Sequence, residues 1–252
     1  MINLFLYFVS VMTSKRYMER EDRNMLGLIQ YELPMIAFEF ICSAVPFLIF
    51  LLTIRLLGKK RMRHAGVEKQ ARGGRERVRV RAAWVYFFVF MVYVTGVFHY
   101  TGAGTLWEPL RYGGVDLSTQ ELNLIPFSRG IDVTGYALNV VLFLPFGVLA
   151  PFLWKNMEKF RNVLAGGFMF SLLIELSQLL NNRSTDVDDL VLNTAGALIG
   201  YAIYGIVASF LPEAAKAAGR IKTNPALVIT VMFLGRFLLF NEMWVALELF
   251  RY

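Results

Sequence analysis

Apolar residues gather in six long stretches along the chain, separated by short polar or charged segments. Each stretch holds about 20 residues, the length a helix needs to cross the hydrocarbon core of a bilayer. Apolar and polar positions do not alternate strictly within them, as the strands of a membrane barrel would require. The pattern predicts an all-α, polytopic transmembrane helical bundle of about six spans, at residues 33–57, 82–100, 136–154, 163–180, 190–211 and 226–246.

Composition narrows this picture in two ways. The chain is 56% hydrophobic and has a mean hydropathy of +0.50, which makes it more apolar than ordinary soluble domains. Its single cysteine, Cys42, excludes an internal disulfide and a cysteine-rich zinc site.

A basic segment between the first two stretches predicts the sidedness of the bundle. Residues 58–81 carry ten lysines and arginines against two glutamates, and positive residues in short loops stay in the cytoplasm. Beside a span, such a run more often meets anionic lipid headgroups than nucleic acid. We therefore expect membrane lipids and no nucleic acid as partners. The acidic segments 101–135 and 181–189 then face outward from a bacterial plasma membrane.

Polar residues interrupt the apolar pattern in four places, all predicted to lie outside or in the outer leaflet. The first is the loop segment Asn123-Leu-Ile-Pro126-Phe127, with Arg129 and Asp132 as neighbours. An apolar, proline-containing stretch in an outer loop indicates a segment that dips into the membrane interface or packs on the helix tops. An ordinary ordered loop is the alternative interpretation.

The second polar place is in the third span, where Asn139 precedes Pro145 and Gly147. Pro145 has no N–H to donate, so the carbonyl of Val141 loses its helical partner and the helix should kink. A free carbonyl inside a membrane needs a side chain or water. Asn139 is either part of a polar site or an amide that links helices.

The third polar place is one face of the fourth span. Ser171, Glu175 and Gln178 follow helical spacing and share that face. Glu175 lies about 7–8 Å below the outer end of the helix. A carboxylate at that depth is costly unless it is paired or solvated, which makes Glu175 a candidate functional residue. A structural hydrogen bond to a neighbour is the alternative.

The fourth place begins with Arg183 and continues into the fifth span with Asp186, Asp188, Asp189 and Asn193. Asp186 or Asp188 can cap the start of that helix. Three aspartates within four residues exceed what one cap needs, so the segment is either a cap alone or a cap joined to a polar site.

Gly196 and Gly200 continue the same helix face and form a pair of small residues four positions apart. Such a pair lets another helix approach closely. The short turn before this span makes the fourth span, 163–180, the expected partner.

Carboxylate and amide oxygens suit Ca²⁺, Mg²⁺ or Mn²⁺, but the aspartate run lacks the glycine and distal glutamate of an EF-hand. His99 is the only outer histidine, too few for a catalytic zinc. We therefore expect no metal and no cofactor, with a divalent cation as the weaker alternative. Arg236, near the middle of the last span, must pair or face water, and its candidate partners are Glu39 and Glu175.

Taken in order, four motifs resemble the VanZ-like family. They are Asn-Leu-Ile-Pro-Phe at 123–127, Asn-Val-x-x-Phe-x-Pro-Phe-Gly at 139–147, Glu-x-x-Gln at 175–178 and Thr-Asp-Val-Asp-Asp-x-x-x-Asn-Thr-x-Gly-x-x-x-Gly-Tyr at 185–201. By position, the resemblance maps the family's signature residues to Asn123, Pro126, Phe127, Asn139, Pro145, Gly147, Glu175, Gln178, Asp186, Asp189, Asn193 and Gly196.

The resemblance covers about residues 82–246 and implies a bacterial integral membrane protein with a five-span core. Residues 1–57, with the first span, and the basic loop 58–81 then form an N-terminal addition. The family's namesake is associated with low-level resistance to teicoplanin, a lipid-tailed glycopeptide that binds cell-wall precursor outside the membrane. The family's chemistry is not fixed by these motifs.

Three functions are compatible with this sequence. The first is a non-catalytic factor whose outward polar pocket binds or shields an amphiphile, such as a lipid-linked wall precursor or a lipoglycopeptide. The second is a membrane enzyme on a lipid-linked substrate with Glu175 as acid or base. A transporter or flippase fits less well, because the spans become apolar toward the cytoplasm. The candidate binding residues are Asn123, Arg129, Asp132, Asn139, Glu175, Gln178, Arg183, Asp186, Asp188, Asp189 and Asn193, with Pro126, Pro145, Gly147, Gly196 and Gly200 as structural residues.

Overall fold

The computed structural model describes residues 33–64, 74–112, 114, 122–128, 132–181, 185–210, 221 and 223–241. The chain divides into two compact units. One unit is 39–241. The other joins 1–38 to 242–252, and the structure describes only its residues 33–38, which begin a helix. The following account concerns the unit 39–241.

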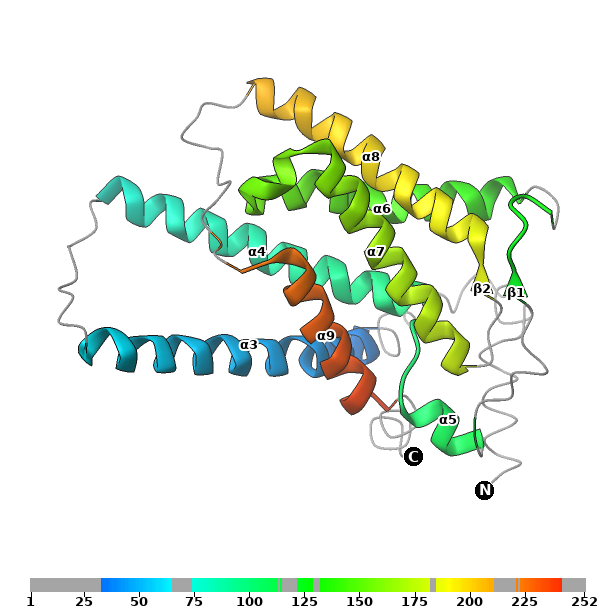
Figure 1. Cartoon of the computed structure of the whole chain (residues 1–252), viewed down its shortest axis with the longest axis horizontal. Coiled ribbons are helices and arrows are strands. Elements are labelled where there is room, and N and C mark those ends of the chain that lie inside the picture. Colours follow the sequence, from blue (N-terminus) through cyan, green and yellow to red (C-terminus); the bar gives the residue numbers. More distant parts are fainter. Residues whose placement is uncertain are drawn as a thin grey trace, which may run out of the picture. The chain divides into compact units, whose positions relative to one another are not determined.

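Helices make up nearly all of the described structure (Figure 1). In chain order the elements are α3 (Leu33–His64), α4 (Gly74–Thr101), α5 (Trp107–Tyr112), β1 (Leu122–Asn123), α6 (Val133–Leu153), η3 (Lys155–Glu158), α7 (Phe160–Gln178), η4 (Leu179–Asn181), β2 (Thr185–Asp186), α8 (Val187–Phe210) and α9 (Pro225–Leu239).

The predicted all-α, multi-span architecture is confirmed. Five of the described helices, α3, α4, α6, α7 and α8, are long and apolar enough to cross a membrane. The sixth predicted span, 226–246, corresponds to α9, a shorter apolar helix of 15 residues. The rest of that span, from 242 onward, lies outside the described residues. Helix α3 runs to His64 and α4 begins at Gly74, so helix also occupies both ends of the predicted loop 58–81.

Glycines on both helices bring α6 and α8 into close contact. A Cβ on Gly196 or Gly200 of α8 would collide with the backbone carbonyl of Val140 or Leu144 in α6, and a Cβ on Gly147 would collide with α8. The predicted close approach at Gly196 and Gly200 is therefore present. The partner of this glycine face is α6 and not α7, the helix that the short turn favoured, because α6 offers its own glycine at the contact.

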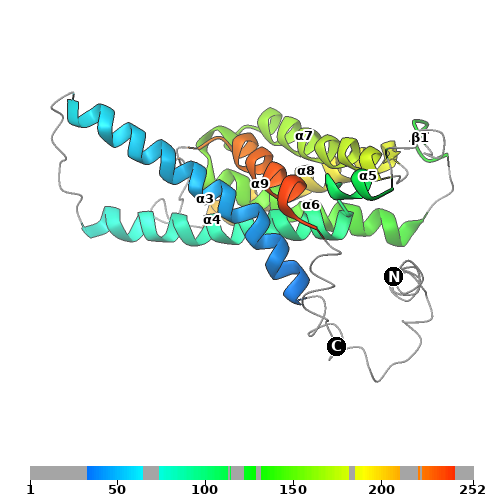
Figure 2. The same cartoon turned by 90° about the horizontal axis from the view of Figure 1, so that it is seen from below.

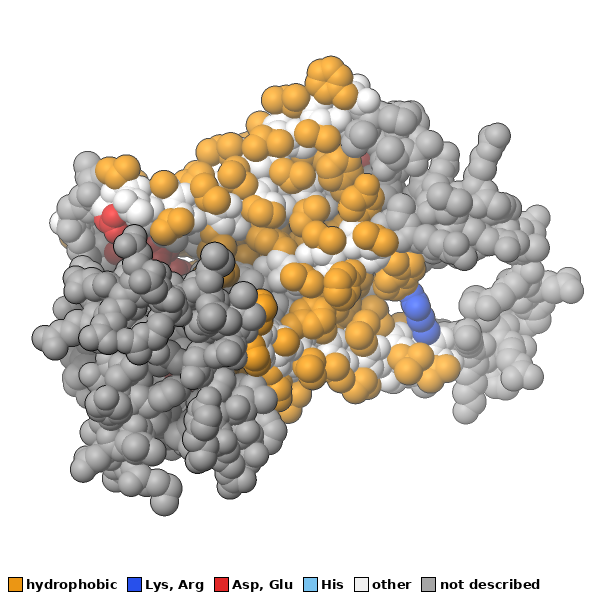
Figure 3. Space-filling view, turned by 180° about the vertical axis from the view of Figure 1, so that it is seen from behind, with side chains coloured by type: hydrophobic (Ala, Val, Ile, Leu, Met, Phe, Trp, Pro, Cys, Tyr) orange, Lys and Arg blue, Asp and Glu red, His pale blue; other side chains and the backbone are white. Residues whose placement is uncertain are grey.

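Aromatic side chains fill the space between α4, α6 and α7. Phe90, Phe143, Phe146 and Phe170 are all buried, and their rings contact one another at centroid distances of 5.2–6.4 Å. The outward faces of the helices carry many exposed apolar side chains, and these gather over the described middle part of the face seen in Figure 3. This distribution suits a bundle that is surrounded by lipid.

Proline does not interrupt α6, which continues through Pro145 and Pro151. The hydroxyl of Tyr93 on α4 donates to the carbonyl of Leu142, one residue after Val141, at 3.0 Å. The carbonyl that Pro145 leaves without a helical donor is that of Val141, so this bond links α4 to α6 one residue away from it.

A buried ion pair attaches α9 to α3. The guanidinium of Arg236 donates to the carboxylate of Glu39 and to the backbone carbonyl of Ala103, and all of Glu39 is buried. His99 of α4 meets the second oxygen of Glu39 at 2.8 Å. Figure 2 shows α9 running beside α3, and the ion pair joins the two helices. Of the two partners that the sequence left open for Arg236, Glu39 is therefore the correct one.

Replacing Gly200 by Leu should destabilise the protein, because the new side chain would meet the backbone carbonyl of Leu144, which cannot move aside. We expect a loss of about 1–3 kcal/mol and a lower melting temperature in detergent. The native thiol of Cys42 is buried, so its reaction with a maleimide dye on heating reports unfolding. Gly205→Leu, on the same helix with nothing within 4 Å, is the matched control. Equal melting temperatures for the two variants would refute the contact.

Replacing either Glu39 or Arg236 by Met should cost about 3–5 kcal/mol, because one charge would stay buried without its partner. The double variant should recover much of that loss, although the carbonyl of Ala103 loses its donor. Arg55→Met is the control, because the Arg55 side chain is exposed. Its guanidinium stacks on the ring of Trp84 at 4.8 Å and does not form a buried ion pair among the described residues. If the double variant loses as much free energy of unfolding as the two single variants lose together, the charges do not interact.

Candidate functional site

Two loops that are far apart in sequence meet at one end of the bundle. Strand β1 pairs in parallel with β2, with Asn123 opposite Asp186. The side-chain amide of Asn123 donates to both carboxylate oxygens of Asp186 at 3.1 Å. This short pairing joins the loop before α6 to the start of α8.

Aspartates cap both helices that begin here. Asp132 accepts from the backbone N–H groups of Thr134 and Gly135 at the start of α6. Asp186 accepts from the N–H of Asp188 at 2.9 Å at the start of α8. The cap predicted for α8 is thus made by Asp186. Carboxylates at helix N-termini also face the positive end of the helix dipole.

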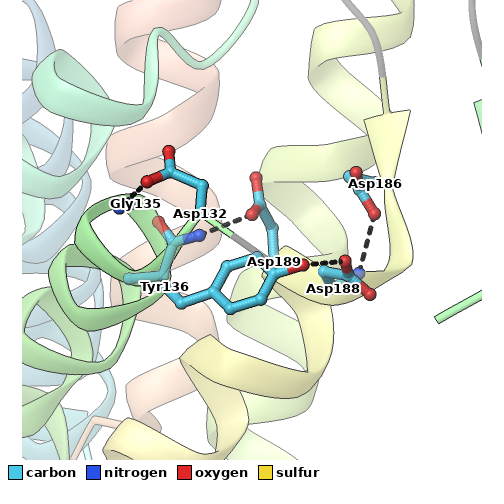
Figure 4. A pocket seen from close by; sticks show the side chains of 7 residues that line it. Asp132, Gly135, Tyr136, Asp186, Asp188 and Asp189 are labelled. Atoms are coloured by element: carbon cyan, nitrogen blue, oxygen red, sulfur yellow. Dashed lines mark hydrogen bonds between the residues drawn. The ribbon is translucent and has the colours of Figure 1, made fainter. Parts of the chain in front are cut away.

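A cavity of about 230 Å³ opens between these helix ends (Figure 4). It is referred to below as the acidic pocket. Its lining residues come from the first two turns of α6 and the start of α8, and they are Asp132, Gly135, Tyr136, Asn139, Asp186, Asp188 and Asp189. Four of the seven are aspartates, and the set contains no lysine or arginine.

Hydrogen bonds hold the lining carboxylates in place (Figure 4). The hydroxyl of Tyr136 donates to one oxygen of Asp188 at 2.7 Å, and the backbone N–H of Phe127 donates to the other at 2.7 Å. The amide of Asn139 donates to Asp189. The hydroxyl of Tyr136 and the amide of Asn139 are therefore each bonded to a lining aspartate.

Two of the carboxylates that line the acidic pocket can accept further hydrogen bonds. Within the described part of the chain, Asp132 and Asp189 each accept through one oxygen only, Oδ1. Their second oxygens remain available at the pocket. An ionised carboxylate is purely an acceptor, so the arrangement suits a ligand group that donates hydrogen bonds or carries positive charge.

Other predicted site residues lie around the pocket but do not line it. Glu175 is buried on α7 and accepts from the N–H of Asp186 at 3.2 Å. Asn193 donates to Ser171 at 3.0 Å, lower in the bundle. Gln178 points to the other side and donates to the carbonyl of Thr101 at 2.8 Å. Arg129 and Arg183 lie outside the described residues.

Gln178 belongs to a second contact, between the end of α4 and the end of α7. The N–H of Gly104 donates to the hydroxyl of Ser177 at 2.9 Å, and a Cβ on Gly104 would meet the Ser177 backbone. This contact places the carbonyl of Gly104 next to Arg236. It therefore links α7 to the ion pair of Arg236 with Glu39.

Tyr136 is a pocket residue that the sequence analysis did not single out. It stands three positions before Asn139 on α6, so the two share a helix face. That spacing was the signal that could have identified it.

In the described ranges, no group of three or more histidine, cysteine, aspartate or glutamate side chains is placed to hold a metal ion. Three of the pocket aspartates direct at least one oxygen to a backbone N–H or a side-chain donor from another segment. The geometry favours a ligand that is itself a hydrogen-bond donor.

Comparison with known proteins agrees with this architecture. The chain matches the family described as VanZ/LLP1 over residues 83–208, from α4 to α8, which is half of its length. It is also 33% identical over 91 residues to "Protein VanZ" of Enterococcus faecium, an alignment that covers 34% of this chain and 54% of that relative. The chain thus spans about half the length of that relative. No solved structure matches it. The match covers half of the chain and includes the helices that build the acidic pocket. The chain therefore belongs to the VanZ-like family of membrane proteins.

Proposed function

We propose that the acidic pocket binds or shields the polar head of an amphiphile at the outer face of a bacterial membrane. The observation that carries this proposal is the set of four aspartates around a cavity of about 230 Å³, in which Tyr136 and Asn139 already donate to two of them. Hydroxyls, amides and ammonium groups of a lipid-linked wall precursor or a lipoglycopeptide would supply the missing donors. Membership of the VanZ-like family extends the proposal to a contribution to teicoplanin resistance.

The depth of the pocket supports a ligand head at the membrane surface. Its lining runs from Asp132, the cap of α6, to Asn139 in the second turn of that helix. Seven residues of helix rise about 10 Å. With the 21 residues of α6 spanning the bilayer core, the pocket opens at the boundary between headgroups and acyl chains and reaches into the outer leaflet.

Two other functions are less well supported. A transporter needs a polar path through the membrane, whereas buried Phe143, Phe146 and Phe170 fill the bundle between α6 and α7. An enzyme with Glu175 as acid or base is the alternative. Glu175 lies behind Asp186 and accepts its N–H instead of lining the pocket, so it is better placed to support the site than to reach a substrate.

The outward orientation of the pocket is part of the proposal. Lys155 and Lys159 lie between α6 and α7 and Arg161 lies in the first turn of α7, at the opposite end of α6 from the acidic pocket. Positive residues beside spans favour the cytoplasm. The acidic end would then face the cell wall.

Cysteine labelling in intact cells tests this orientation. In a Cys42→Ala background, Thr185→Cys should react with a membrane-impermeant maleimide, whereas Gln70→Cys should react only after the cells are opened. The unlabelled Cys42→Ala protein is the control for background reaction. Reaction at position 70 from outside the cell would show that the orientation is inverted.

Asp189→Asn and Glu175→Gln test the function of the site. Loss of a charge-assisted hydrogen bond costs about 1.5–3 kcal/mol, so Asp189→Asn should weaken binding of lipid-linked wall precursor or teicoplanin about 10- to 100-fold. Glu175→Gln should have a smaller effect on binding, since this residue does not line the pocket. Binding is measured on purified protein in lipid nanodiscs, and teicoplanin susceptibility is measured in cells that express each variant.

Glu158→Gln is the matched control, because Glu158 lies in η3 between α6 and α7, away from the pocket. Full binding and unchanged susceptibility in well-folded Asp189→Asn protein would show that the pocket is structural. Conversion of the precursor to a product, abolished by Glu175→Gln, would instead identify an enzyme.

A further inference from the structure

The loop after β1 displays large apolar side chains beside the acidic pocket. Leu124 and Ile125 are 71% and 69% exposed, and Phe127 is 51% exposed. The segment 124–128 contains no charged residue. In a water-soluble protein such an exposed apolar cluster would promote aggregation or mark a site of interaction with another molecule.

The backbone of this loop is fixed, so the exposure is built into the fold. The side-chain oxygen of Asn123 accepts from the N–H of Ile125 at 3.3 Å and from the hydroxyl of Ser128 at 2.8 Å. Phe127 has a positive φ of 58°, which a bulky residue rarely adopts, and its N–H is bound to Asp188. Together these bonds hold the loop backbone in the conformation that leaves Leu124, Ile125 and Phe127 exposed.

The same bonds fix the height of the loop relative to the spans. Phe127 contacts Tyr136, in the first turn of α6, and Asp188, in the first turn of α8. Helix α6 has 21 residues and is about 31 Å long, close to the roughly 30 Å of a bilayer core. The loop therefore lies level with the boundary between headgroups and acyl chains.

The lipid-facing side of α6 is apolar up to the level of the loop. Val133, Leu138 and Val141 on that helix are 57–71% exposed and belong to a membrane-spanning segment. Because the loop lies level with the outer end of this segment, lipid is the occupant that its apolar side chains meet. A soluble partner would have to cover an apolar patch that is level with the membrane.

We propose that Leu124, Ile125 and Phe127 form a wedge that inserts into the lipid leaflet at the mouth of the acidic pocket. A molecule anchored in that leaflet would reach the pocket sideways, along the wedge, without leaving the membrane. The wedge itself does not rest on the proposed ligand, because insertion follows from the position and chemistry of the loop alone.

Spin labels on single cysteines test the wedge in the full chain. In a Cys42→Ala background, Leu124→Cys and Ile125→Cys are labelled and the protein is placed in vesicles of phosphatidylcholine and phosphatidylglycerol. Val141→Cys is the lipid-facing reference, and Asn156→Cys, exposed in η3, is the water-facing reference. Collisions with oxygen and with a water-soluble nickel complex are measured by electron paramagnetic resonance.

We expect both loop labels to resemble Val141→Cys, with collisions with the nickel complex severalfold fewer than at Asn156→Cys. Labels as accessible to nickel as Asn156→Cys would overturn the wedge. Labels protected from both reagents, with spectra that change with the ratio of protein to lipid, would show that a second copy of the chain covers the loop, and would also overturn it. Asp189→Asn protein should give the same loop result, so failure of the pocket and failure of the wedge remain distinguishable.

Discussion

The close approach of α6 and α8 is the contact on which the polar end of the molecule depends. It requires the glycines at 147, 196 and 200, because any side chain there would strike the backbone of the opposing helix. The approach fixes the spacing one turn higher, where Asn139 bonds Asp189 and Tyr136 bonds Asp188. Helices separated by one more side chain would draw the Asn139 amide away from Asp189 and the Tyr136 hydroxyl away from Asp188. The contact between small residues thus permits the hydrogen bonds that stabilise the carboxylates of the acidic pocket.

Buried charge is compensated differently in the two polar regions of the bundle. Near α9, the charges of Glu39 and Arg236 neutralise each other, and the backbone carbonyls of Ala103 and Gly104 accept from Nη1 of the guanidinium. Around the pocket no described cation plays that role. There the aspartates accept from helix N-termini, amides and a tyrosine hydroxyl, so the negative charge is solvated without being cancelled. The Glu39–Arg236 pair balances its charges within the chain, whereas the described lining of the pocket carries four carboxylates and no cation.

Sequence patterns predicted the spans because a bilayer imposes one length and one chemistry on every helix that crosses it. They also predicted the cap at Asp186 and the small-residue contact at Gly196 and Gly200, since both follow from local spacing. They did not predict which helix meets that contact, because Gly147 acts only when α6 and α8 are already side by side. The pairing of Asn123 with Asp186, across 63 positions, and the role of Tyr136 likewise depend on tertiary arrangement. Rules of local sequence spacing carry no information about contacts between residues that are far apart in the sequence.

Asp188 connects the two surfaces at the polar end of the bundle. One of its oxygens holds the hydroxyl of Tyr136 inside the pocket, and the other holds the backbone of Phe127 in the apolar loop. Because both bonds end on one carboxylate, the loop and the pocket lining keep a fixed relation to each other. The pocket offers acceptors to a polar, donor-rich group, and the loop beside it offers an apolar surface. A molecule whose polar head and apolar tail are joined can occupy both at once, and neither surface alone would select for that combination.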